Sequence, residues 1–128
     1  MPKQQPQIQQ PQQPDDQQPS PQQRLYTVLA AIPPGKVVTY GQLARLAGMP
    51  RRARWVGQTL KQLPADSRLP WYKVINAQGR ISFPPGSAAA NRQAEKLRAE
   101  GIEVSPQYRI NLQRYAFDAD SGSGAAPA

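Results

Sequence analysis

Residues 39–61 read TYGQLARLAGMPRRARWVGQTLK, and the rest of the chain is expected to pack around them. Thr39 can cap a helix, and Gln42, three residues later, can complete a capping box. Gly48 suits the left-handed residue that ends a helix, and a second helix can begin after residues 49–50. Two short helices joined by a turn that contains glycine are typical of a helix-turn-helix.

The second helix of this motif has two different faces. Small and apolar residues recur on the face predicted to be buried, namely Ala53, Val56, Gly57 and Leu60. The other face carries Arg51, Arg54, Trp55, Gln58 and Lys61. A polar outer face is normal for any surface helix. This one is basic throughout and has no carboxylate, which favours a helix that faces DNA.

Charge is concentrated in the same part of the chain. The protein has 128 residues and a formal net charge of +8. No Asp or Glu occurs between Arg24 and Leu63, a segment that contains seven Lys or Arg residues: Arg24, Lys36, Arg45, Arg51, Arg52, Arg54 and Lys61. Net charge alone is equally consistent with a soluble basic protein that has no specific partner. Its concentration in one segment favours a polyanion such as nucleic acid.

The chain contains no cysteine and no histidine. Thiolate nucleophiles, imidazole bases, disulfides and the usual zinc ligands are therefore excluded. No paired carboxylates have the spacing of an acid–base site, so we predict no catalytic residue, no metal and no cofactor. No apolar run is long enough to span a bilayer, and the Gln/Pro-rich start does not resemble a signal peptide. The sequence predicts a cytoplasmic protein with no membrane partner.

Before the helix-turn-helix, residues 1–19 are rich in Gln and Pro and are predicted to be a disordered extension. A folded domain is expected over residues 20–117, with a flexible tail over residues 118–128. A first helix should begin with Ser20 and Gln23 as a capping box and should end at residues 33–35. Its apolar face is formed by Leu25, Val28, Leu29 and Ile32.

After the helix-turn-helix, residues 73–75 and 80–82 are predicted to form a small hairpin across residues 76–79. Ser87 can cap a last helix that runs through Glu100. Apolar residues then alternate with polar ones in a way that predicts a final short strand: Tyr108, Ile110 and Leu112. The expected fold class is mainly α with a small β-hairpin (α+β).

Three motifs resemble one known family in order and spacing: residues 35–44 (GKVVTYGQLA), residues 54–57 (RWVG) and residues 69–76 (LPWYKVIN). The family is the O6-alkylguanine-DNA alkyltransferases, whose active-site motif is Pro-Cys-His-Arg-Val. Trp71 stands at the position of the acceptor cysteine, which is the mark of the alkyltransferase-like proteins. Those proteins bind alkylated DNA without repairing it. The resemblance covers about residues 24–112 and implies the family's winged helix-turn-helix-like C-terminal domain.

The resemblance implies a role for several residues. Tyr40 would help to rotate a nucleotide out of the duplex, and Arg54 would fill the vacated stack. Trp71, with Tyr40 and Val74, would line a pocket for the flipped base. Without the resemblance, Tyr40 and Trp71 are core aromatics and Arg54 is a phosphate contact. The residues expected to contact DNA are Thr39, Gln42, Arg51, Arg52, Trp55, Gln58, Lys61 and Lys73.

Two positions depart from the family pattern. Tyr72 replaces the histidine that follows Trp in most relatives, a loss that should matter little where there is no thiol to activate. Pro84 stands where some relatives have an arginine that probes the base electrostatically, and Arg80 is the nearest substitute. How alkylated guanine is distinguished from guanine is thus left open by the sequence.

The resemblance implies a monomeric, non-enzymatic sensor that binds O6-alkylguanine in double-stranded DNA and flips the base. It would flag the lesion for nucleotide excision repair proteins. The alternative is a winged-helix transcription regulator that binds undamaged DNA, in which Trp71 belongs to the core. A working alkyltransferase is excluded by the absence of cysteine.

Overall fold

Two short strands lie between two groups of helices in the computed structural model, which describes residues 18–118. The elements in chain order are α2 (Pro21–Ala30), β1 (Val38–Thr39), α3 (Tyr40–Leu46), α4 (Ala53–Lys61), the 3₁₀ helix η1 (Trp71–Lys73), β2 (Val74–Ile75), α5 (Ala88–Ala99) and α6 (Leu112–Tyr115). A mainly helical α+β fold is thereby confirmed. The predicted disordered extension and flexible tail fall almost wholly outside the described residues.

The helix-turn-helix forms as predicted, from α3 and α4. The Thr39 hydroxyl accepts a hydrogen bond from the Gln42 N–H at 3.1 Å, and Gly48 has a φ of +83° where α3 stops. The second half of the predicted capping box does not form, because the Gln42 side chain donates to the Phe117 carbonyl instead. Arg51, in the turn before α4, also has a positive φ of 71°.

The first helix, α2, begins with the predicted capping box. The Ser20 hydroxyl accepts from the Gln23 N–H at 3.1 Å, and the Gln23 side chain accepts from the Ser20 N–H at 2.8 Å. Arg24 donates through Nε to the Ala47 carbonyl at 3.1 Å. This bond joins α2 to the end of α3 and satisfies one of the carbonyls that a helix end leaves free.

The small sheet is parallel, so the predicted hairpin is wrong. β1 pairs with β2, with Val38 opposite Val74. Residues 76–80 still form a tight turn, because the Asn76 side chain accepts hydrogen bonds from the backbone N–H groups of Gln78 and Arg80, both at 3.0 Å. After this turn the backbone of Arg80 pairs with Arg109 rather than continuing along β2.

The predicted final strand is reduced to single bridges. Asn111 is extended, and its side chain accepts from the Arg114 N–H at 3.3 Å, so it caps the short helix α6. The chain then returns to β1, where the Val37 N–H donates to the Tyr115 carbonyl at 2.9 Å and the Phe117 N–H donates to the Val37 carbonyl at 2.7 Å. The alternation predicted the burial of Ile110 correctly, but the helix-capping asparagine ends the extended segment.

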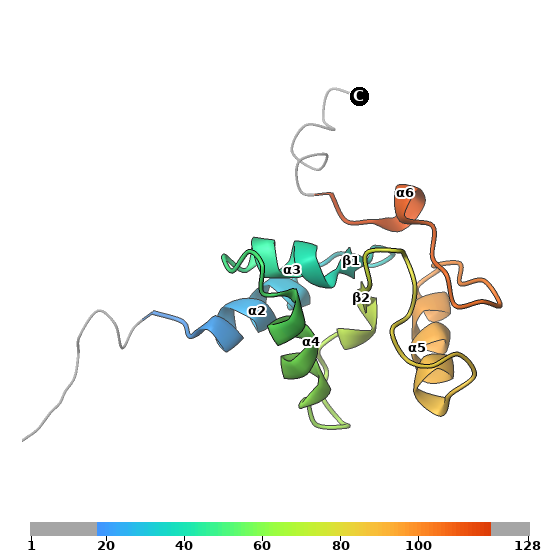
Figure 1. Cartoon of the computed structure of the whole chain (residues 1–128), viewed down its shortest axis with the longest axis horizontal. Coiled ribbons are helices and arrows are strands. Elements are labelled where there is room, and N and C mark those ends of the chain that lie inside the picture. The colour runs from blue at the N-terminus through green and yellow to red at the C-terminus, as the bar shows by residue number, and fades with distance from the viewer. Residues whose placement is uncertain (1–17, 119–128) are drawn as a thin grey trace, which may run out of the picture.

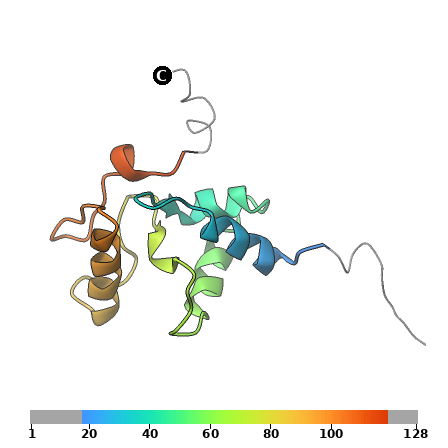
Figure 2. The same ribbon diagram turned by 180° about the vertical axis from the view of Figure 1, so that it is seen from behind.

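The strands separate two hydrophobic cores. α2, α3 and α4 lie on one side of the strands and α5 lies on the other, in the front view and from behind (Figures 1 and 2). Successive side chains of β1 and of the residue before it face opposite sides of the sheet. Val38 therefore packs with Val74 among α2–α4. Val37 packs with Ile75 against α5 and the C-terminal segment. No helix within residues 18–118 is long and apolar enough to cross a membrane.

Candidate nucleic-acid interface

A cavity of about 200 Å³ lies where α3, α4, η1 and α5 meet. Its lining residues come from all four elements and from the loop after the residue 76–80 turn: Tyr40, Gly57, Leu60, Lys61, Trp71, Ser82, Phe83, Pro84 and Gln93. Two of the three residues predicted to line a base pocket, Tyr40 and Trp71, are therefore brought together. They are far apart in sequence and meet because β1 and β2 pair.

Trp71 forms an aromatic wall of the cavity. Its ring meets Tyr72 edge to face, with centroids 5.9 Å apart, and meets Phe83 in the same way at 6.4 Å. It is only partly buried and belongs to neither hydrophobic core. The indole offers a flat apolar surface beside the cavity, and it carries no group that could accept an alkyl substituent.

Tyr40 reaches the cavity at the start of α3, beside Gly57 of α4. A Cβ atom at Gly57 would lie 3.7 Å from the Tyr40 ring. The absence of a side chain at this position lets the two helices approach closely and leaves the cavity open between the ring and α4. A larger residue at Gly57 would fill part of this space.

The turn before α4 and the outer face of that helix together carry an exposed, unpaired basic surface. Within residues 18–118, the side chains on it make no hydrogen bond and no ion pair with the protein: Arg51, Arg52, Arg54, Gln58 and Lys61. Lys61 also lines the cavity, so the basic surface and the cavity are continuous. Cations without protein partners at the edge of a cavity are suited to a polyanion that contributes one of its groups to that cavity.

Four of the side chains predicted to contact DNA are already engaged within the protein, three by polar contacts and one by packing. The prediction that Lys73 contacts DNA is wrong, because Lys73 is only 2% exposed and its ammonium is bound to three protein oxygens. Gln42 uses its amide on the C-terminal segment, as described above. Thr39 keeps its hydroxyl on the α3 cap. Trp55 is partly buried against the core of α2–α4 rather than projecting outward.

Two expectations about the pocket are also corrected. Val74 is 1% exposed and belongs to the core of α2–α4, because it faces Val38 across the sheet, so it is not a wall of the cavity. Arg80 is exposed and lies outside the cavity, where its backbone pairs with Arg109. Pro84 does line the cavity, so this departure from the expected family pattern lies at the site. The cation at this cavity is Lys61.

Lys73 belongs to a polar network that anchors η1. Its ammonium donates to the carbonyls of Ile32 and Pro33 at 3.1 and 2.7 Å and forms an ion pair with Glu100 at 3.1 Å. The same carboxylate accepts from the Tyr72 hydroxyl and from the Gly35 N–H. The network joins the end of α5 to the turn after α2 and fixes the segment that carries Trp71.

The network shifts the pKa of Tyr72 and the pKa of Glu100 in opposite directions. Burial raises the pKa of Tyr72, and the hydrogen bond to Glu100 and its charge raise it further, to about 12. Burial would also raise the pKa of Glu100. Hydrogen bonds from Tyr72, Gly35 and Lys73, with the charge of Lys73, outweigh burial and hold that pKa below its ordinary value of 4.5. Glu100 is therefore ionised and Tyr72 is neutral at pH 7.

This arrangement predicts a specific pH dependence of stability. Because the pKa of Glu100 is lower in the folded state, its contribution is complete above pH 4.5 and is lost as the pH falls through the folded value. We expect the free energy of unfolding to fall less steeply below pH 4.5 in Glu100→Gln than in the unmodified protein, as measured by urea unfolding at a series of pH values. Glu95→Gln, an exposed change on the same helix, is the control. Equal acid slopes in the two variants would contradict the role of Glu100.

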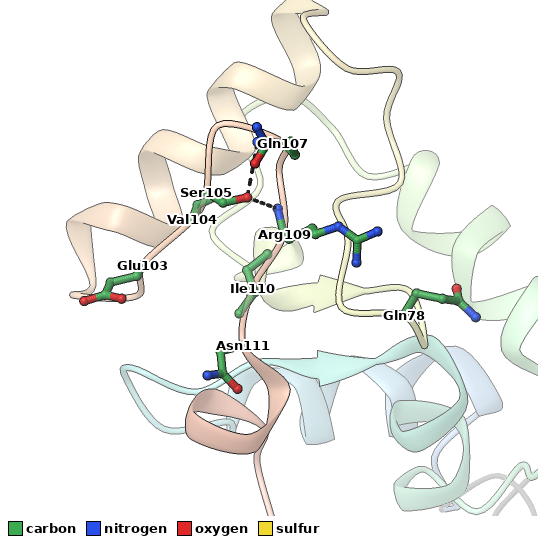
Figure 3. A pocket seen from close by; sticks show the side chains of 8 residues that line it. All are labelled: Gln78, Glu103, Val104, Ser105, Gln107, Arg109, Ile110 and Asn111. Carbon is green, nitrogen blue, oxygen red and sulfur yellow. Dashed lines mark hydrogen bonds between the residues drawn. The ribbon is translucent and has the colours of Figure 1, made fainter.

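A second, larger hollow of about 560 Å³ lies along the C-terminal segment (Figure 3). Ser105, one of the residues that line it, accepts hydrogen bonds from the N–H groups of Gln107 and Arg109 at 3.2 and 3.1 Å and so stabilises its wall. None of the residues predicted to contact DNA lines this hollow. The sequence therefore directs attention to the cavity beside Trp71.

Sequence reasoning did not assign Ser82, Phe83 or Gln93 to the site, nor Glu100 to the network that supports it. Gln93 lines the cavity and is buried on the inward face of α5, which also includes Ala90, Ala94 and Leu97. The signal was present, because a glutamine at the i+3 position of an apolar i, i+4, i+7 pattern falls on the buried face. Phe83 and Glu100 gave no such signal, since their partners lie far away in the sequence.

Comparisons with known proteins agree with the motifs. A family model for the DNA-binding domain of 6-O-methylguanine DNA methyltransferase matches residues 20–102. The chain is 50% identical over 96 residues to the DNA base-flipping protein of Escherichia coli (strain K12), a match that covers 75% of this chain and 73% of that protein. Alkyltransferase-like protein 1 of Schizosaccharomyces pombe is 43% identical over 98 residues, which cover 73% of this chain and 91% of that protein.

The fold is also similar to a solved structure. The crystal structure of S. pombe Atl1 in complex with damaged DNA containing O6-carboxymethylguanine has a TM-score of 0.70 at 38% identity, covering 84% of this chain and 99% of that chain. All the residues that line the cavity lie within the 20–102 region that the family model matches.

Proposed function

The chain belongs to the family of the 6-O-methylguanine DNA methyltransferase DNA-binding domain, and on this premise we propose that it is a non-enzymatic sensor of O6-alkylguanine in duplex DNA. The observation that supports this proposal most directly is the cavity beside Trp71, at the edge of an unpaired basic helix face. The similar proteins are named for base flipping or for alkyltransferase likeness, and one is bound to damaged DNA.

In the proposed mechanism the basic face of α4 docks on the phosphate backbone. Arg51, Arg52 and Lys61 neutralise phosphates, which positions the protein without reading sequence. Arg54 enters the stack where the base was, because a planar guanidinium can both stack and donate hydrogen bonds to the orphaned partner base. Tyr40, at the start of α3, supports the rotated nucleotide. Flipping costs a few kcal/mol, and less where alkylation has already weakened the base pair.

The flipped base would enter the cavity between Tyr40 and Trp71. Leu60 and Phe83 complete an apolar lining on which an O6-alkyl group can be buried. Each buried CH₂ contributes about 0.8 kcal/mol. The weakened pair and the buried alkyl group together give a physical basis for preferring the lesion over guanine.

The complex would persist because the protein has no reaction that removes the alkyl group and releases the repaired DNA. The chain has no cysteine, so no thiol can accept the alkyl group. The Tyr72 hydroxyl, at the position of the family's histidine, donates to Glu100 and braces η1. A stable, shielded lesion has to be removed by another pathway, and we propose that the complex marks it in the cytoplasm for nucleotide excision repair proteins.

The proposal is tested by binding of the purified full chain, as a monomer, to two duplexes that differ only in guanine or O6-methylguanine at one site. Salt must be fixed, because phosphate contacts make affinity steeply dependent on ionic strength. A preference of about tenfold or more for the lesion, or about 1.4 kcal/mol, is expected. Equal affinity for both duplexes would reject base flipping. Sequence-dependent binding to undamaged DNA would instead support the transcription-regulator alternative.

A further inference from the structure

Gln93 combines burial, polarity and a place in the cavity wall. Its side chain is on α5 and is only 2% exposed. The amide nitrogen donates to the carbonyl of Tyr72 at 2.8 Å and to that of Val74 at 3.2 Å. Both N–H groups are therefore used to hold the backbone around η1 and β2.

These two bonds also determine which end of the Gln93 amide is the nitrogen and which is the oxygen. Both neighbours are carbonyl oxygens, so the nitrogen must face them, and the alternative orientation of the amide would place oxygen against oxygen. The side-chain oxygen, Oε1, is left over. Among residues 18–118 it accepts no hydrogen bond, although the residue is buried and lines the cavity.

A buried acceptor without a donor is destabilising, and most buried polar groups are paired. Such an oxygen in a cavity wall is suited to a ligand that supplies an N–H group. The other polar side chains of the lining are donors or can be both donor and acceptor: Tyr40, Lys61 and Ser82. Gln93 thus provides the acceptor that is buried in this wall.

Alkylation at O6 removes the hydrogen from N1 of guanine, which leaves the exocyclic 2-amino group as the only N–H donor on the base. We infer that Gln93 Oε1 accepts a hydrogen bond from this 2-amino group and thereby restricts the cavity to purines that carry it. This inference rests on the proposed function and adds the class of base that the site accepts. A flipped base is commonly read by hydrogen bonds along the edge that was paired.

The test uses the full chain and three duplexes that differ at one base: guanine, O6-methylguanine and O6-methylhypoxanthine, which lacks only the 2-amino group of O6-methylguanine. Each base is placed opposite an abasic site, so that the strength of a base pair does not contribute. We expect O6-methylhypoxanthine to bind about tenfold more weakly than O6-methylguanine.

The informative variant is Gln93→Lys. An ammonium can still donate to the carbonyls of Tyr72 and Val74, but it has no acceptor. We expect the ratio of the two affinities to fall to about two or less in this variant. The ratio is compared because the added charge strengthens binding to every duplex alike. Gln93→Leu, which loses the donors as well, should weaken binding to both modified bases.

The outcomes separate this inference from the proposed function. Equal binding of guanine and O6-methylguanine when each is paired in an intact duplex, where the strength of the base pair does contribute, would overturn the proposed function. A preference for O6-methylguanine over guanine, with equal binding of O6-methylhypoxanthine, would overturn the role of Gln93 alone. An unchanged ratio in Gln93→Lys would also overturn it. The comparison of the modified bases in the unmodified protein stands even if a variant does not fold.

Discussion

Replacing Lys73 with alanine is expected to lower the free energy of unfolding by about 3–5 kcal/mol, the usual effect of removing one partner from a buried ion pair. The ammonium is almost fully buried and holds three protein oxygens, those of Ile32, Pro33 and Glu100. Its loss removes a charged donor from two carbonyls and leaves the Glu100 carboxylate with its hydrogen bonds from Tyr72 and Gly35 but without a cation to pair with. Urea unfolding followed by circular dichroism would measure the change.

Lys61→Ala is the matched control for this prediction. Lys61 is exposed on α4 and has no protein partner among the described residues, so its loss should change stability by about 0.5 kcal/mol or less. The double variant of Lys73→Ala with Glu100→Gln should recover part of the loss, since the unpaired carboxylate is then removed. A cost below about 1 kcal/mol for Lys73→Ala would show that the network does not hold the fold.

Replacing Arg54 with alanine is expected to weaken DNA binding rather than stability. The free energy of unfolding should be unchanged, and the affinity for O6-methylguanine duplexes should fall about 100-fold, or about 2.7 kcal/mol. Arg54 is exposed and, within residues 18–118, bonds to nothing in the protein. If the Arg54 guanidinium occupies the space left by the flipped base, the variant leaves a gap in the base stack of the duplex. Binding to undamaged DNA should fall only by the few-fold that one lost phosphate contact accounts for.

Arg52→Ala provides the comparison, because Arg52 is an exposed arginine two residues away on the same basic surface. It should weaken binding to damaged and undamaged duplexes by the same few-fold factor and reduce the salt dependence of both. Equal losses on the two duplexes in Arg54→Ala would mark Arg54 as one more phosphate contact and would remove it from the flipping mechanism.

The parts of the fold that the sequence predicted are those determined by nearby residues. A helix cap depends on residues three positions apart, so Ser20, Thr39 and Ser87 could each be recognised as caps. Strand pairing depends on which distant segment competes best. Residues 73–75 therefore looked like half of a hairpin with residues 80–82, although β1 is their actual partner.

The same distinction explains the site. The motifs identified Tyr40 and Trp71, which both line the cavity. A lysine after Tyr72 in a basic protein reads as a DNA contact, because nothing local reveals that Glu100 and the α2 turn will surround it. Whether a charged side chain is buried depends on its partners in the tertiary structure. The spacing of motifs in the sequence does not identify these partners.

The parallel pairing of β1 with β2 also has a consequence for the order of folding. The strands join Val38 to Val74, so the pairing closes a loop that contains all of α3 and α4. Local helices form within about a microsecond, whereas contacts between distant segments wait for loop closure. The cavity between Tyr40 and Trp71 exists only after that closure. We therefore expect a variant that loses the β1–β2 pairing to lose the cavity, and with it the proposed binding of a flipped base, even where its basic residues still contact phosphates.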